Sequence, residues 1–103
     1  MTGQSHPRHD IDETLTAPVR LSIVAALMQV DDVEFQALRD SLEVSDSVLS
    51  KQASQLESVG YVVISKGYVG KRPRTWLSVT PAGRAAFARH LSALRAIVGE
   101  AGQ

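Results

Sequence analysis

The sequence has no cysteine among its 103 residues. This absence excludes disulfide bonds, zinc sites built from thiolates and regulation through thiol oxidation. The sequence also has no run of about 18–20 consecutive apolar residues, so we expect no transmembrane helix. Its N-terminus lacks the basic and then apolar pattern of a secretion signal, and we therefore expect a cytoplasmic protein. The length is that of one domain with a hydrophobic core of its own.

The sequence also has no net charge, because 11 Lys and Arg residues balance 11 Asp and Glu residues. The charges are nevertheless separated along the chain. Residues 1–46 carry three bases and nine acids, a charge of −6, and residues 47–103 carry eight bases and two acids, a charge of +6. Four of the bases fall within nine residues: Lys66, Lys71, Arg72 and Arg74. This asymmetry indicates either a surface for a polyanion or a solvated basic loop.

Helical spacing of apolar residues, together with capping residues, predicts four helices. Ser45 and Thr80 are typical N-cap residues, Pro81 suits a first helical position, and Gly60 is a typical helix stop. The predicted helices span residues 18–29, 35–42, 45–59 and 81–98.

A β-hairpin with a basic tip is predicted before the last helix. Residues 61–66 and 74–79 are rich in β-branched and aromatic residues, and residues 67–73 between them contain two glycines and a proline. A shorter extended segment is expected at 33–35. The expected organisation is a flexible tail over residues 1–9, one domain over 10–98 and a frayed end over 99–103.

The order of these elements is that of an α+β, mainly α, winged helix-turn-helix. It consists of a three-helix core, a two-stranded wing and a long C-terminal helix. In such a fold, helix 45–59 enters the major groove of double-stranded DNA. The wing at 67–73 lies on the phosphate backbone or in the adjacent minor groove, where basic side chains meet a negative potential.

Two stretches of the sequence resemble a known family. The stretch from Leu49 to Val62 is similar to the recognition helix and first wing strand of MarR/ArsR-like bacterial regulators. The stretch from Gly70 to Arg84, which contains Arg-Thr-Trp and then Thr-Pro-Ala-Gly-Arg, resembles small stand-alone winged-helix regulators. The resemblance covers about residues 11–98. It implies a homodimeric DNA-binding transcriptional regulator, with repression as the expected mode. The chain lacks the cysteines of metal-sensing and thiol-based relatives and the additional helices that form an effector pocket, so no small-molecule effector is identified.

Candidate DNA contacts follow from this fold, because Ser and Gln bind base edges and Lys and Arg bind guanine or phosphate. In the recognition helix they are Ser45, Ser47, Ser50, Lys51, Ser54 and Gln55. In the wing they are Lys66, Tyr68, Lys71, Arg72 and Arg74. Ser45 suits a cap better than a DNA contact, and the Tyr68 hydroxyl either donates to phosphate or the ring packs on the hairpin. Arg72, beside Pro73, is the favoured minor-groove residue.

Helix 81–98 carries a stripe of side chains with two interpretations. The stripe packs on the core of its own chain, or it forms a seam with a second copy. The candidate interface residues are Phe87, His90, Leu91, Leu94 and Val98. We favour the homodimer, with residues 11–24 also available to the interface, and a two-fold dimer predicts a pseudo-palindromic operator. Trp76 is expected to lie against helix 81–98, and Arg84 to pair with an acid or a DNA phosphate.

No catalytic residue, metal site or cofactor is predicted. Gly67 and Gly70 lie in a hairpin and not before a helix, and no nucleophile motif is present. His6 and His9, with Asp10 beside them, could imitate a metal site. They lie in a proline-containing tail that offers no third fixed ligand, so we expect no metal there. The alternative function is a winged-helix module that binds another protein without DNA specificity of its own. Such a module would expose apolar or aromatic residues on helix 45–59, where this sequence has Ser, Lys and Gln.

Overall fold

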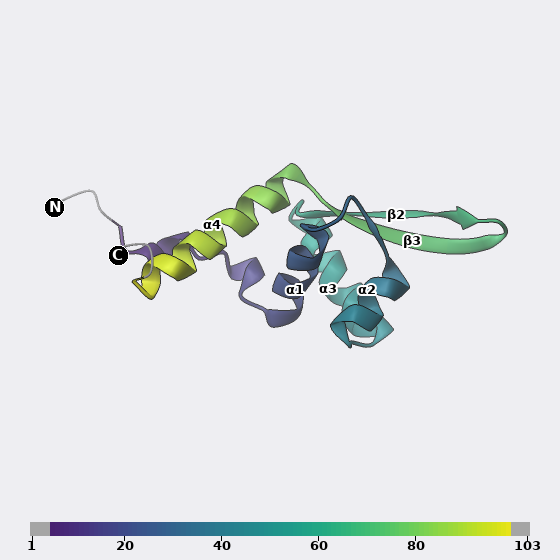
Figure 1. Ribbon diagram of the computed structural model, residues 1–103, viewed down its shortest axis with the longest axis horizontal. Helices are drawn as coiled ribbons and strands as arrows, with labels where there is room; N and C mark the ends of the chain where they lie inside the picture. Colours follow the sequence, from purple (N-terminus) through teal and green to yellow (C-terminus); the bar gives the residue numbers. More distant parts are fainter. Residues whose placement is uncertain (1–4, 100–103) are drawn as a thin grey trace.

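The structure is a computed structural model that describes residues 5–99 and consists of four helices and a three-stranded antiparallel sheet (Figure 1). The helices are α1 (Pro18–Leu27), α2 (Phe35–Leu42), α3 (Asp46–Ser58) and α4 (Pro81–Ile97). The strands are β1 (Val33–Glu34), β2 (Val62–Val69) and β3 (Arg72–Val79), in the spatial order β1-β3-β2. Two 3-10 turns, η1 (Pro7–Asp10) and η2 (Glu13–Leu15), precede α1. This is the predicted winged-helix order of elements.

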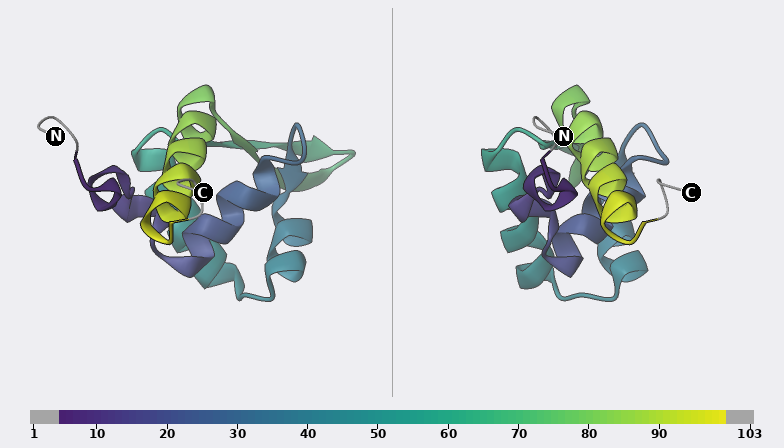
Figure 2. Two further views of the ribbon diagram at one scale, coloured as in Figure 1. Left: turned by 60° about the vertical axis from the view of Figure 1, so that its left-hand side comes forward. Right: turned by 90° about the vertical axis from the view of Figure 1, so that its left-hand side faces the viewer.

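The molecule is elongated, with α1, α2 and α3 at its centre (Figure 1). The β2–β3 hairpin projects from one end of this centre, and α4 extends toward the other end. Figure 2 shows η1 beside α4 from two further directions. Within the described residues, no helix is long and apolar enough to cross a membrane.

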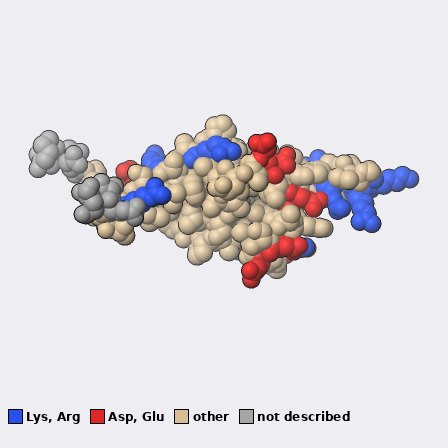
Figure 3. All heavy atoms as spheres, in the orientation of Figure 1, with Lys and Arg blue, Asp and Glu red and all other residues tan. Residues whose placement is uncertain are grey.

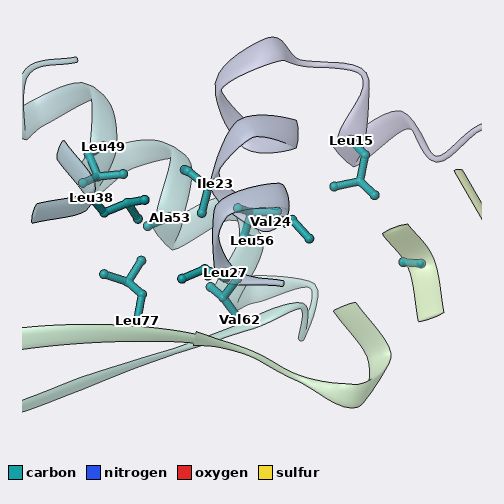
Figure 4. Packing of buried hydrophobic residues seen from close by; sticks show 11 residues of the cluster. Leu15, Ile23, Val24, Leu27, Leu38, Leu49, Ala53, Leu56, Val62 and Leu77 are labelled. Atoms are coloured by element: carbon teal, nitrogen blue, oxygen red, sulfur yellow. The ribbon is translucent and has the colours of Figure 1, made fainter. Parts of the chain in front are cut away.

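One hydrophobic core holds the three central helices against the sheet (Figure 4). Its most buried members are Ile23, Val24 and Leu27 of α1, Leu38 of α2, Leu49, Ala53 and Leu56 of α3, Val62 of β2 and Leu77 of β3. Each fully buried Leu or Ile stabilises the fold by about 1.5–3 kcal/mol. Leu15 of η2 lies to one side of the other labelled residues in Figure 4, and Ala86 of α4 belongs to the same cluster.

The helices end close to the predicted positions, and α2 matches its prediction at both ends. α1 ends at Leu27, two residues before the predicted end. The predicted extended segment at 33–35 pairs with β3, since Val33 lies opposite Leu77 and Glu34 opposite Trp76. The sheet therefore has a third strand in addition to the two-stranded wing.

The connection at the wing tip is shorter than the predicted loop at 67–73. The strands pair as far as Val69 and Arg72, so only Gly70 and Lys71 form the turn. Gly70 has a φ of 63° and Lys71 does not have a positive φ, the pattern of the type II′ turn that suits twisted hairpins. Pro73 is tolerated in β3 because β1 pairs only with Trp76 and Leu77. At Pro73, β3 therefore has β2 as a neighbour on one side and is an edge strand on the other.

The predicted terminal segments are described only in part. Residues 1–4 of the predicted tail and residues 100–103 of the predicted frayed end lie outside the described residues. Within the rest of the predicted tail, Pro7–Asp10 form η1, where the His6 side chain accepts a hydrogen bond from the Arg8 N–H at 3.0 Å.

Hydrogen bonds hold the start of α4 against the residues that follow α3. The Thr80 hydroxyl accepts from the Gly83 N–H at 2.9 Å, as expected of an N-cap, and donates to the Gly60 carbonyl at 2.6 Å. The Thr80 N–H donates to the Tyr61 carbonyl at 3.0 Å. A Cβ at position 83 would overlap that same carbonyl oxygen and would lie 2.9 Å from a Val79 methyl group. Glycine at position 83 therefore allows α4 to start directly against the α3–β2 corner.

We predict that Gly83→Ala lowers the free energy of unfolding by about 1–3 kcal/mol, the usual cost of overpacking. Helix propensity alone would change it in the opposite direction by about 1 kcal/mol. Urea denaturation measures the sign, and Ser92→Ala on the exposed face of α4 is the control, expected to be neutral or slightly stabilising. An increase in stability for Gly83→Ala would contradict the close contact.

Candidate nucleic-acid interface

A tight turn between α2 and α3 sets the direction of the recognition helix. Glu43 has a φ of 57° and is the non-glycine residue with a positive φ within residues 5–99. The Ser45 hydroxyl then accepts from the Val48 N–H at 3.2 Å and lies 3.2 Å from the Ser47 hydroxyl. Ser45 is therefore the N-cap of α3, as predicted, and its hydroxyl is already engaged within the helix.

An arginine of α2 also holds the first turn of α3. Arg39 Nη1 lies 2.7 Å from the Asp46 carboxylate, and Arg39 Nη2 lies 3.0 Å from the Asp40 carboxylate. The hydrogen bonds to Asp46 and then to Asp40 raise the pKa of the Arg39 guanidinium. Asp46 is therefore paired within the chain, although it begins a helix that is proposed to approach DNA.

The exposed face of α3 collects the predicted DNA contacts. Leu49, Ala53 and Leu56 are buried in the core. Because successive residues of an α-helix are about 100° apart, the opposite face is formed by the residues between them. The exposed candidates on α3 are Ser47, Ser50, Lys51, Ser54 and Gln55. The structure thus brings the predicted recognition residues together on one polar face.

A residue that the sequence did not indicate also touches this helix. Arg20 of α1 donates to the Gln52 side chain at 2.7 Å and to the Gln55 side chain at 2.6 Å. Its Nε donates to the Thr14 carbonyl of η2 at 2.7 Å. Arg20 is more than 30 positions from its partners in α3, so no local sequence pattern could identify it.

The wing carries exposed bases at its tip. Lys71 forms the turn, Arg72 follows it, and Lys66 is exposed in β2. Figure 3 shows Lys and Arg side chains at the end of the hairpin, whereas acidic side chains gather nearer α2 on the face in view. Tyr68 is 73% exposed, so its ring has little packing on the hairpin.

Arg74 differs from the other bases of the wing. Its Nε lies 2.7 Å from Glu34 Oε2, an ion pair across the β1–β3 edge. The register places Glu34 opposite Trp76, two residues from Arg74 and on the same face of the sheet. An acid from the first half of the chain therefore balances this base. The sequence did not show this pairing, because 40 residues separate the two.

The Trp76 ring lies beside Gly67 on the neighbouring strand. A Cβ at position 67 would be 3.3 Å from the edge of the ring. The register agrees, since Trp76 pairs with Ser65 and Gly67 is the next residue on that face of β2. This placement on the hairpin differs from the expected packing of Trp76 against helix 81–98.

A cleft of about 410 Å³ separates α3 from the inner face of the sheet. Its walls combine polar side chains of the two predicted contact regions with apolar residues of the core. The lining residues are Ser50, Ala53, Ser54 and Glu57 of α3, Ile64 and Lys66 of β2, Thr75 and Leu77 of β3, and Phe35 of α2. Helix α3 and the part of the hairpin around Lys66 and Thr75 therefore line a common cleft.

The predicted interface stripe on α4 is divided between buried and exposed side chains. Phe87 is partly buried against the core of its own chain. His90 is 2% exposed, and its Nδ1 accepts from the Asp12 N–H at 3.1 Å, so it lies inside the chain and not on the expected outer stripe. Leu94 is 39% exposed and Val98 is 75% exposed. Leu91 is half-buried, and Ile97, which the sequence did not single out, is 43% exposed.

The sequence favours an acid or a DNA phosphate as the partner of Arg84. In the structure, the partner of Arg84 Nη1 is the Met28 sulfur, at 3.9 Å.

Asp12 connects the N-terminal segment to the corner where α3 ends. The Tyr61 hydroxyl donates to Asp12 Oδ2 at 2.5 Å, and the Thr14 N–H donates to Asp12 Oδ1 at 2.9 Å. The hydrogen bond to Asp12 raises the pKa of Tyr61, and burial adds to this increase. Because the folded-state pKa is raised, the resulting stabilisation is complete at neutral pH and is lost as pH rises through that pKa, above about 10.

Comparison with known families agrees with this architecture. The family model of the winged helix DNA-binding domain matches residues 19–98. The protein therefore belongs to this family of winged helix DNA-binding domains. The match extends from α1 through the last residues of α4, so it includes the recognition helix, the wing and the C-terminal helix.

Individual relatives define the type of winged helix. Uncharacterized protein MJ0432 of Methanocaldococcus jannaschii is 32% identical over 73 residues, which cover 71% of this chain and 79% of the relative. The transcriptional regulator homologue of Pyrococcus horikoshii OT3 is 27% identical with a TM-score of 0.82, over 92% of this chain and 95% of that one. A MarR family regulator from Rhodococcus sp. RHA1 is 15% identical with a TM-score of 0.68, over 90% and 68% of the two chains. The chain thus has the fold of MarR-type transcriptional regulators, and the predicted winged-helix resemblance is confirmed.

We predict that Tyr61 ionises above the usual tyrosine value of about 10. In a Tyr68→Phe variant Tyr61 is the remaining tyrosine, so the tyrosinate absorbance follows this residue alone during a pH titration. Adding Asp12→Asn keeps an acceptor for the Thr14 N–H but removes the negative charge, and we expect a lower midpoint. Equal midpoints with and without Asp12→Asn would contradict the assigned cause.

Proposed function

We propose that the protein is a sequence-specific transcriptional regulator that binds double-stranded DNA as a homodimer. The observation that carries this proposal is a cleft that Ser50 and Ser54 of α3 share with Lys66 and Thr75 of the hairpin. The polar face of α3 is exposed on one side of it, and the hairpin continues beyond it to the exposed bases Lys71 and Arg72. An α-helix fits the major groove, and a basic hairpin suits the adjacent backbone or minor groove. Because such a regulator acts on the chromosome, the cytoplasmic location expected from the sequence is part of the proposal.

Different parts of this surface have different proposed roles. Ser47, Ser50, Lys51, Ser54 and Gln55 contact base edges, and Ser45 positions the start of α3 as its cap and lies near a phosphate. Lys66, Tyr68 and Lys71 contact phosphates, Arg72 enters the minor groove, and Arg74 contacts the backbone while Glu34 holds its orientation. The exposed face of α3 is polar apart from Val48, which favours DNA over a protein partner on this face.

The proposed dimer uses the C-terminal half of α4. Leu94, Ile97 and Val98 are large apolar side chains left exposed at the end of the molecule opposite the hairpin, and Leu91 is half-buried beside them. The stripe on α4 begins at Phe87. A two-fold dimer through this stripe places two recognition helices on DNA half-sites that are about 34–36 Å apart, or separated by a multiple of that distance. His90 supports the interface from within by holding the N-terminal segment on α4. Repression is the proposed mode, because a dimer bound over a promoter blocks transcription without a further partner.

The first test removes the charges at the wing tip. We predict that Lys71→Gln with Arg72→Gln weakens DNA binding on the order of 30-fold for each protomer at ~150 mM salt. The slope of log K against log salt should fall by about 1.8 for each protomer, since each base held against the DNA, on a phosphate or in the minor groove, displaces counterions and contributes about 0.9. Fluorescence anisotropy at several salt concentrations measures both quantities.

The matched control is Arg8→Gln with Arg89→Gln, which removes two exposed bases from η1 and α4, two elements that lie away from the hairpin tip. This control should leave the affinity and the slope unchanged. Equal losses in the two double variants would show a general charge effect and would contradict the proposed role of the wing.

The second test concerns the dimer. We predict that the natural protein sediments as a dimer and that Leu94→Glu with Val98→Glu makes it a monomer, because four carboxylates would be buried in the seam. Operator binding should weaken, since the two half-sites would then be bound independently. Val30→Glu, at an exposed apolar residue after α1, is the control that should remain dimeric. A dimeric double variant would exclude this stripe as the interface.

A further inference from the structure

The contact between Arg20 and the recognition helix determines how the Gln55 amide is oriented. Arg20 Nη1 lies 2.6 Å from the Gln55 oxygen and 2.7 Å from the Gln52 oxygen. A guanidinium group has donors and no acceptor, so the amide atom that faces it in each glutamine is the oxygen. The Gln55 NH2 group is therefore directed away from Arg20.

Arg20 is itself held in place. Its Nε donates to the Thr14 carbonyl at 2.7 Å, so the planar guanidinium has partners at two of its nitrogens. The side chain is half-buried, which limits the alternative positions that it can adopt. The orientation of the Gln55 amide thus depends on a fixed donor and not on a mobile surface side chain.

Gln52 and Gln55 share this donor but differ in position. Gln52 is half-buried toward α1, whereas Gln55 is exposed beside Lys51 and Ser54 on the face proposed to meet DNA. Gln55 is therefore the member of the pair whose NH2 group is available to a base.

We infer that Arg20 makes Gln55 a donor in the major groove and thereby a residue selective for guanine. Adenine is normally bound by glutamine through two bonds, one accepted by the amide oxygen and one donated by the NH2 group. With its oxygen directed to Arg20, Gln55 cannot align both atoms with an adenine. Guanine offers two acceptors, N7 and O6, and no donor on this edge, so it matches a side chain that only donates. This inference rests on the proposed function.

The decisive experiment is selection of bound sequences from a random pool of duplex DNA by the full chain. The natural protein should select guanine at one position in each half-site. Gln55→Ala should lose the preference at that position alone. Arg20→Met removes the donor but keeps an apolar stem, so the freed amide should select adenine there, with a change in the guanine-to-adenine ratio of about tenfold or more.

Two further variants make the result independent of folding defects. Gln55→Glu is exposed and keeps a partner for Arg20, but it has no donor, so the guanine preference should disappear. Gln52→Ala removes the hydrogen bond of Arg20 to the other glutamine and should leave the preference unchanged. Thermal unfolding shows whether Arg20→Met remains folded. If it does not, Gln55→Glu and Gln55→Ala decide whether the NH2 group of Gln55 selects guanine.

The outcomes separate this inference from the proposed function. Selection of an operator by the natural protein, with guanine retained in Gln55→Ala or in Arg20→Met, would overturn the role of Arg20 and Gln55 and leave the regulator intact. Absence of any selected sequence for the natural protein would overturn the proposed function itself.

Discussion

The close approach of the Tyr61 backbone to the first turn of α4 is the contact on which the rest of the structure depends. The Tyr61 carbonyl accepts the Thr80 N–H and lies against Gly83, while its hydroxyl donates to Asp12. The end of α3, the start of β2, the start of α4 and the N-terminal segment therefore meet at one residue. Because Gly83 has no Cβ, α4 can begin there and continue away from the hairpin, so that the proposed dimer stripe and the wing lie at opposite ends.

Ion pairs within the chain determine which charges remain for a partner. Asp46 is paired with Arg39, and Glu34 is paired with Arg74, so an acid of the recognition helix and a base of the wing are partly neutralised. Lys66, Lys71 and Arg72 are left exposed along the hairpin. A chain of zero net charge can thus present a basic surface, because charges of opposite sign are placed on different parts of the fold.

Much of the fold followed from the sequence. Ser45 and Thr80 cap the helices that they were predicted to cap, and the apolar face of Leu49, Ala53 and Leu56 is buried as its spacing indicated. The predicted wing loop was too long, because the strands continue to a two-residue turn that depends on pairing between segments and not on local composition. The candidate contacts on α3 share one face for the same helical reason, and whether they bind DNA stays a prediction.

The sequence by itself determined the helices, their caps and the family, because these depend on residues within about four positions of one another and on the order of the elements. Only the tertiary structure decided that His90 is buried on Asp12, that Arg74 is paired with Glu34 and that Arg20 orients Gln55. These contacts join residues that are at least 35 positions apart. Their geometry depends on how the core packs α1, the sheet and α4 around α3, which no single segment specifies.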